Sequence, residues 1–97
     1  MKHYILEHGD VKEVPLLEWA EWFEHFELRN IAQTEISENV RVSTVFLGID
    51  HNFLDDGPPL LFETMVFGLK EEICYRSAML DEAKMVHEKV VEFIKKG

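Results

Sequence analysis

The sequence predicts an α+β protein, in which a single antiparallel sheet of four to six strands is covered by two helices. Two hydrophobic runs with the composition of strands, Val40 to Ile49 and Leu60 to Gly68, flank a polar loop that ends in two prolines. Apolar residues at helical spacing precede and follow this pair, at 15–28 and from Leu80 onward. The chain has 97 residues, so we expect residues 1–97 to form a single domain.

The amino-terminal part predicts a short hairpin. Lys2 to Glu7 alternates as a strand does, His8-Gly9-Asp10 suits a tight turn, and Val11 to Val14 can return as a second strand.

A helix over about residues 15–28 is predicted next. Pro15 fits its first turn, where a missing amide donor costs nothing. Trp22 widens the apolar stripe, so Trp19 and Trp22 are either core residues or anchors of an interface. The residues of the stripe are Leu16, Trp19, Ala20, Phe23 and Phe26.

Turn residues separate the remaining strands. Ser37-Glu38-Asn39 can join a half-exposed strand, Ile31 to Ser37, to the Val40 strand. Alternation stops after Thr44, which indicates a central strand covered on both faces at its far end. Gly48 interrupts that strand, and we expect a bulge or a close backbone approach there.

The last strand and the last helix follow a turn at Gly68-Leu69-Lys70. In the strand Glu72 to Ala78 we expect Cys74 to be a small buried residue rather than a nucleophile. From Leu80 the helical period returns, and we expect His87 to be a hydrogen-bonded core histidine rather than a ligand. The inner stripe of the helix is Ala83, Val86, His87, Val90 and Ile94.

The formal net charge of −9 restricts the choice of partner. Such a field repels nucleic acid and anionic membranes, so we expect no direct nucleic-acid binding and no membrane binding. The negative charge favours solubility, and it would also favour docking on a basic surface of another protein. A single cysteine, no signal-peptide pattern and no apolar run near the roughly 20 residues of a membrane span together predict a cytoplasmic protein.

The polar loop contains the residues with the most chemistry. We considered a calcium loop starting at Asp50, but positions five, six and twelve are Leu54, Asp55 and Leu61, which do not fit. A site that combines the loop with Glu63 and His87 is an alternative, since burial could raise the pKa of Glu63 toward the range of a general acid or base. The opposing interpretation is that Glu63 is hydrogen bonded to the turn and has a structural role. The candidate binding residues of this region are Asp50, His51, Asn52, Asp55, Asp56, Glu63 and His87.

The segments VSTVFLGIDHNF, PPLLFETMVFG and DEAKMVHEKVV resemble a family of small uncharacterised proteins of tailed phages and prophages. The resemblance covers nearly the whole chain and implies a phage context, without implying an activity. The loop is more acidic than the family pattern, and Met79 stands where a capping Ser or Thr is usual. The matching positions are Trp19, Trp22, Asp50, His51, Pro58, Pro59, Glu63 and His87.

We found no phosphate loop, serine elbow, paired-cysteine motif or basic stripe. We therefore predict no metal and no cofactor, and favour a non-enzymatic accessory protein. It would bind a host or phage protein through its acidic surface or through Trp19 and Trp22. A small-ligand or metal-binding protein, or a minor enzyme, at the 50–56 loop is the alternative. A homodimer through a spare strand edge or the aromatic helix is a third hypothesis.

Overall fold

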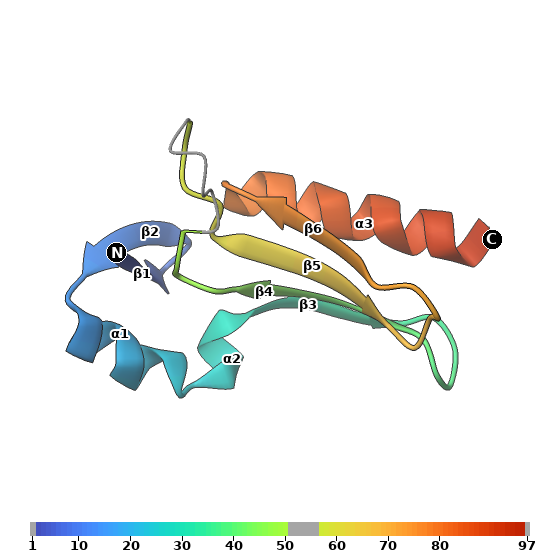
Figure 1. Ribbon diagram of the computed structural model, residues 1–97, viewed down its shortest axis with the longest axis horizontal. Coiled ribbons are helices and arrows are strands. Elements are labelled where there is room, and N and C mark those ends of the chain that lie inside the picture. Colours follow the sequence, from blue (N-terminus) through green and yellow to red (C-terminus); the bar gives the residue numbers. More distant parts are fainter. Residues whose placement is uncertain (1, 51–56, 97) are drawn as a thin grey trace.

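The computed structural model describes residues 2–50 and 57–96, which form an α+β fold (Figure 1). The elements in chain order are β1 (His3–Glu7), β2 (Asp10–Val14), α1 (Leu16–Phe23), α2 (Phe26–Arg29), β3 (Asn30–Glu35), β4 (Arg41–Phe46), β5 (Phe62–Phe67), β6 (Ile73–Ser77) and α3 (Leu80–Lys96).

The main sheet has four antiparallel strands in the order β3-β4-β5-β6, so each strand pairs with its neighbour in sequence. Opposite residues include Thr44 and Thr64 across β4 and β5, and Glu63 and Arg76 across β5 and β6. The predicted central position of β4 is confirmed. Glycine closes the turn after β5, where Gly68 has φ +100° and a Cβ would overlap the Asn39 carbonyl.

The predicted amino-terminal hairpin is present, but β1 and β2 form a two-stranded sheet of their own. They meet the main sheet just beyond the end of β4, where the Tyr4 amide donates to the Gly48 carbonyl over 2.8 Å. Gly48 has φ +74°. A Cβ at this position would overlap the backbone carbonyl oxygen of Tyr4 and lie 2.6 Å from Trp19 Nε1. The predicted close backbone approach at this glycine is therefore confirmed.

The helix α3 covers one face of the main sheet and buries most of the core against it. The Glu82 carboxylate accepts a hydrogen bond from the Ala78 amide over 3.0 Å, which ties the first turn of α3 to the residue before Met79. The fully buried side chains of the sheet point toward α3, and they include Val42, Thr44, Phe46, Phe62 and Thr64.

The single helix predicted over 15–28 is wrong. The helix stops at Phe23, because His25 leaves helical geometry with φ −92° and ψ 89°, and α2 then runs in a new direction. Arg29 fixes this break, since its Nε donates to the Phe23 carbonyl over 2.8 Å. The break carries Phe26 and Arg29 to the face of the main sheet that α3 leaves open.

None of the helices within residues 2–50 and 57–96 combines the length and the apolar character that a bilayer crossing requires.

Candidate functional site

His87 belongs to a buried hydrogen-bond network between α3 and the main sheet. Its Nε2 lies 2.9 Å from Thr34 Oγ1 and its Nδ1 lies 2.8 Å from Thr44 Oγ1, while Thr44 and Thr64 share a hydrogen bond of 2.7 Å. The imidazole is 1% exposed, and this burial lowers its pKa. A neutral imidazole has one donor and one acceptor, and two threonine hydroxyls satisfy both. The prediction of a hydrogen-bonded core histidine is confirmed.

Glu63 lies on the opposite face of the sheet from His87, so the structure does not bring these two predicted site residues together. Its Oε2 accepts a hydrogen bond from Arg76 Nε over 3.3 Å and lies 3.3 Å from Arg76 Nη2. The neighbouring residue Thr64 points into the core instead. Because side chains alternate between the two faces of a strand, no rotamer of Glu63 can reach under α3.

Asp50 has a structural role at the base of the central loop. Its Oδ1 accepts a hydrogen bond from the Leu60 amide over 2.9 Å, which joins the two ends of the loop. The other loop candidates, His51, Asn52, Asp55 and Asp56, lie outside the described residues. Within the described ranges, no group of three or more His, Cys, Asp and Glu side chains is placed to hold a metal ion.

Both tryptophans are partly buried and contact the rest of the fold. The Trp19 indole donates to the Leu47 carbonyl over 3.3 Å and stacks against Phe23 with ring centroids 4.6 Å apart. Trp22 meets Phe46 edge to face at 5.5 Å. These contacts fasten α1 to the end of the sheet, and both tryptophans remain partly exposed.

The open face of the main sheet carries a groove of about 690 Å³. Its floor is built by alternate residues of β3, β4 and β5, and α2 forms one wall. Methionine and phenylalanine supply apolar surface, and charged groups surround it. The lining residues are Phe26, Arg29, Gln33, Glu35, Arg41, Ser43, Val45, Glu63, Met65 and Phe67.

All three arginines of the chain lie on this face. Arg29 lies over the ring of Phe23 at 3.9 Å, and Arg41 lies 5.1 Å from the ring centre of Phe67. Arg76 pairs with Glu63, whereas the ion pairs formed among the described residues include neither Arg29 nor Arg41. Two guanidinium groups are thus held by aromatic rings beside a groove, with donors left for a carboxylate.

Cys74 lies on the same face of the edge strand β6 and is exposed, so the prediction that it is buried is wrong. Side chains of β6 alternate between its two faces, and Ser77 lies on the face that turns into the core. Cys74 therefore lies on the opposite face. Partial desolvation and the nearby Glu63 carboxylate raise the pKa of the Cys74 thiol, which lowers its thiolate fraction and its reactivity at neutral pH.

No family model, curated protein or solved structure matches this chain.

The groove uses residues that the sequence interpretation did not single out, namely Phe26, Arg29, Arg41 and Phe67. One signal was present in the sequence: the chain has only three arginines. The position of Arg29 could not be found in the same way, because it depends on the helix break at His25.

Proposed function

We propose that this protein is a binding module without catalytic activity of its own, and that it holds a segment of another protein on the open face of the main sheet. The observation that carries the proposal is the pair Arg29 and Arg41, stacked on phenylalanine rings beside the groove and without a carboxylate partner among the described residues.

The chemistry of the groove favours a segment that carries a carboxylate among apolar side chains. Arginine binds carboxylates through two parallel hydrogen bonds, and a guanidinium already stacked on a ring loses little freedom on binding. Phe26 and Phe67 are 50% and 42% exposed and offer apolar surface next to these groups. Aromatic and arginine side chains are also the residues most enriched among interface hot spots.

The net charge adds a second requirement for the partner. A charge of −9 repels an acidic protein at a distance and attracts a basic one. Beyond about 8 Å that field is screened at physiological ionic strength, so the local guanidinium groups decide contact. The partner that fits is therefore a basic protein with an apolar docking segment that contains an aspartate or a glutamate.

The biological setting in this proposal comes from the sequence alone. The resemblance to small proteins of tailed phages and prophages supports an accessory role in the cytoplasm of an infected cell, with a host or phage protein as the partner.

A selection from a random dodecapeptide library on the purified protein tests the binding proposal. We expect enriched peptides to hold Asp or Glu beside aliphatic or aromatic residues. The double variant Arg29→Gln/Arg41→Gln should weaken their binding at least about tenfold, or 1.4 kcal/mol. The control Lys84→Gln/Lys95→Gln changes the net charge equally on α3 and should have little effect. Peptides without acidic residues, or equal binding to both double variants, would overturn the proposal.

A further inference from the structure

The strand β6 is an edge of the main sheet, and no described strand pairs with its outer side. The Leu47 amide donates to the Leu61 carbonyl over 2.8 Å, and the Ile36 amide donates to the Val40 carbonyl over 2.8 Å. These bonds fix the alternation of the ladder, because hydrogen-bonded positions recur at every second residue of an antiparallel pair. In β4 the odd-numbered residues therefore bond to β5, and in β5 the even-numbered residues bond to β6.

The same alternation decides which groups of β6 face outward. Ile73, Tyr75 and Ser77 bond back to β5 through the pairs that they form with Val66, Thr64 and Phe62. The backbone amides and carbonyls of Cys74 and Arg76 therefore point to the edge, and Glu72 continues this series just before the strand. An edge of this kind is a template for another strand.

The side chains along this edge are complementary to a second copy of themselves. In an antiparallel pair centred on Cys74, Glu72 lies opposite Arg76 of the second copy, and the reverse pair forms on the other side of the two-fold axis. The outward-facing residues 72, 74 and 76 then all occupy hydrogen-bonded positions. Centring on Tyr75 instead leaves Glu72 opposite Ala78, and centring on Arg76 sets two arginines against each other. Only the register centred on Cys74 pairs both charges of the edge.

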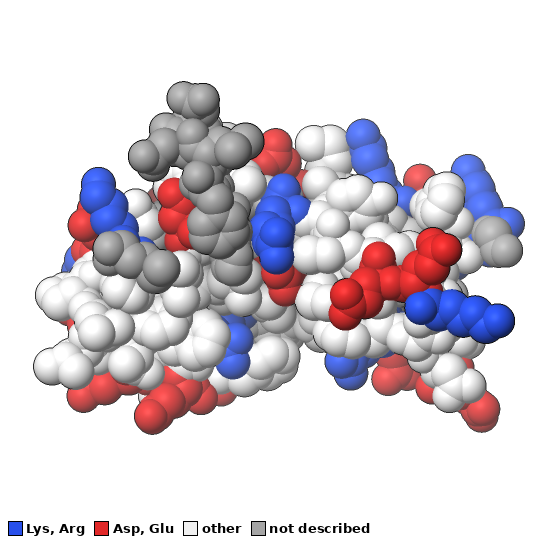
Figure 2. Space-filling model, in the orientation of Figure 1, with Lys and Arg blue, Asp and Glu red and all other residues white. Residues whose placement is uncertain are grey.

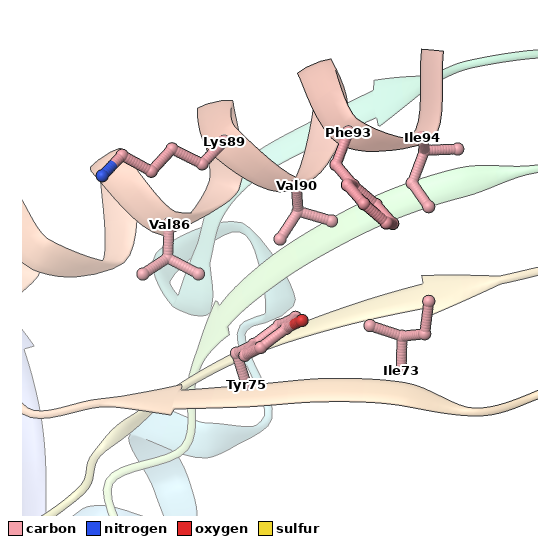
Figure 3. A pocket seen from close by; sticks show the side chains of 7 residues that line it. All are labelled: Ile73, Tyr75, Val86, Lys89, Val90, Phe93 and Ile94. Atoms are coloured by element: carbon pink, nitrogen blue, oxygen red, sulfur yellow. The ribbon is translucent and has the colours of Figure 1, made fainter. Parts of the chain in front are cut away.

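The other face of β6 is also complementary in this register. Ile73 of one copy lies opposite Tyr75 of the other at non-hydrogen-bonded positions, where opposing side chains are closest. Both residues line an apolar groove of about 310 Å³ between β6 and α3. Figure 3 shows Val90 and Phe93 of α3 pointing across this groove toward Tyr75 and Ile73. Tyr75 is 52% exposed and Phe93 is 72% exposed, so each copy has large apolar surface to bury there.

Lys89 is the one charged side chain among the described residues that line this groove. Figure 2 shows uncharged atoms covering the area between β6 and α3, with acidic and basic groups at its margins. A monomer that leaves Tyr75 and Phe93 in water at a bare strand edge invites association.

We propose that two copies of this chain pair antiparallel through β6, centred on Cys74, into one continuous eight-stranded sheet. Both α3 helices then lie on the same face, and the aromatic side chains of each copy cover the apolar groove of the other. Arg76 bridges Glu63 of its own chain and Glu72 of the second copy. The two open faces with their binding grooves are joined side by side, which gives the dimer two equivalent docking sites.

Sedimentation velocity over a range of concentrations tests this interface. We expect a reversible dimer that Glu72→Arg and Arg76→Glu each weaken at least about tenfold, because each places two like charges opposite each other. An equimolar mixture of the two variants should form a heterodimer, since both cross-strand pairs then have opposite charges. Lys70→Glu, which lies outside the paired segment, is the control and should leave the dimer intact. Circular dichroism shows whether Arg76→Glu disturbs the fold through Glu63.

Thiol cross-linking gives an independent measurement, because Cys74 is the only cysteine of the chain. The Cα atoms of a hydrogen-bonded pair are about 5.5 Å apart, so a short bis-maleimide should link the two Cys74 thiols into a covalent dimer. The variant Cys74→Ser/Lys84→Cys moves the thiol to α3 and should not be linked. A protein that is monomeric up to millimolar concentration would overturn the proposal, as would a dimer that neither charge variant weakens.

Discussion

The two faces of the four-stranded sheet are built from alternate residues of the same strands, yet they have different chemistry. On the face under α3, Val42, Thr44 and Phe46 of β4 are completely buried, and the polar groups there are hydrogen bonded to each other. On the open face, the same strand presents Arg41 and Ser43 to a groove. The first face stabilises the fold. The second carries the groove, which α2 borders on one side.

The largest difference between the faces should appear when a phenylalanine is truncated. Phe46→Ala removes a ring that is 0% exposed and packs against Trp22 and Phe62, so it should cost about 3–5 kcal/mol of unfolding free energy. Phe67→Ala on the open face should cost less than about 1 kcal/mol. Urea denaturation of both variants measures the difference, and equal losses would contradict the assignment of the two faces.

Removing a polar group should also cost more unfolding free energy on the covered face than on the open face, but the difference should be smaller than for the phenylalanines. Thr44→Val removes the hydroxyl shared by His87 Nδ1 and Thr64 Oγ1, and leaving buried groups unsatisfied costs about 1–3 kcal/mol. Ser43→Ala changes the adjacent residue, whose hydroxyl accepts a hydrogen bond from Gln33, and should cost less than about 1 kcal/mol because the exposed Gln33 amide can bond to water instead. Urea denaturation should rank Thr44→Val well below Ser43→Ala in stability. The reverse order would show that the His87 chain is not a structural network.

The smallest expected effect is a pH dependence of the unfolding free energy that comes from His87 on the covered face. Burial lowers the pKa of His87 in the folded state from its ordinary value of 6.5, so the unfolded chain takes up the proton first as pH falls. The contribution of His87 to the unfolding free energy is therefore complete above pH 6.5. It declines below that pH, by at most about 1.4 kcal/mol per pH unit. We would measure the urea midpoint at several pH values between neutral and mildly acidic. In His87→Gln the midpoint should fall less steeply with decreasing pH than in the unmodified protein. It should keep the slope in His25→Gln, which changes an exposed imidazole on α2's border. The same slope in both variants would assign the effect to other groups.

Much of the covered face could be predicted from the sequence because burial leaves a periodic signal. The spacing of Ala83, His87 and Val90 predicted the inner stripe of α3, and all three are buried. Turn residues predicted the hairpins. Gly48 predicted a bulge or a close backbone approach, and the structure shows the close approach, with Tyr4 as the partner. These are local rules of period, turn chemistry and backbone freedom, so a sequence expresses them directly.

The open face could not be predicted in the same way, since its residues are brought together by the path of the chain. Cys74 was expected to be buried because cysteine usually is, but the register of an edge strand placed Ser77 in the core instead. Arg29 joins Arg41 only because the helix breaks at His25. The separation of Glu63 from His87 likewise follows from strand alternation relative to α3, which no spacing in the sequence reveals.

Methyl NMR of the methionines is the most direct test of whether the open face is the binding surface. Met65 lines the groove, whereas Met79 and Met85 are exposed at the start of α3 and along it. We would label the methionine methyl groups with ¹³C and titrate the protein with a peptide selected as described above. The account predicts that the Met65 signal shifts in a saturable way while those of Met79 and Met85 stay in place. Saturable shifts at Met79 or Met85 with an unchanged Met65 signal would contradict it and move the binding surface to the α3 side of the sheet.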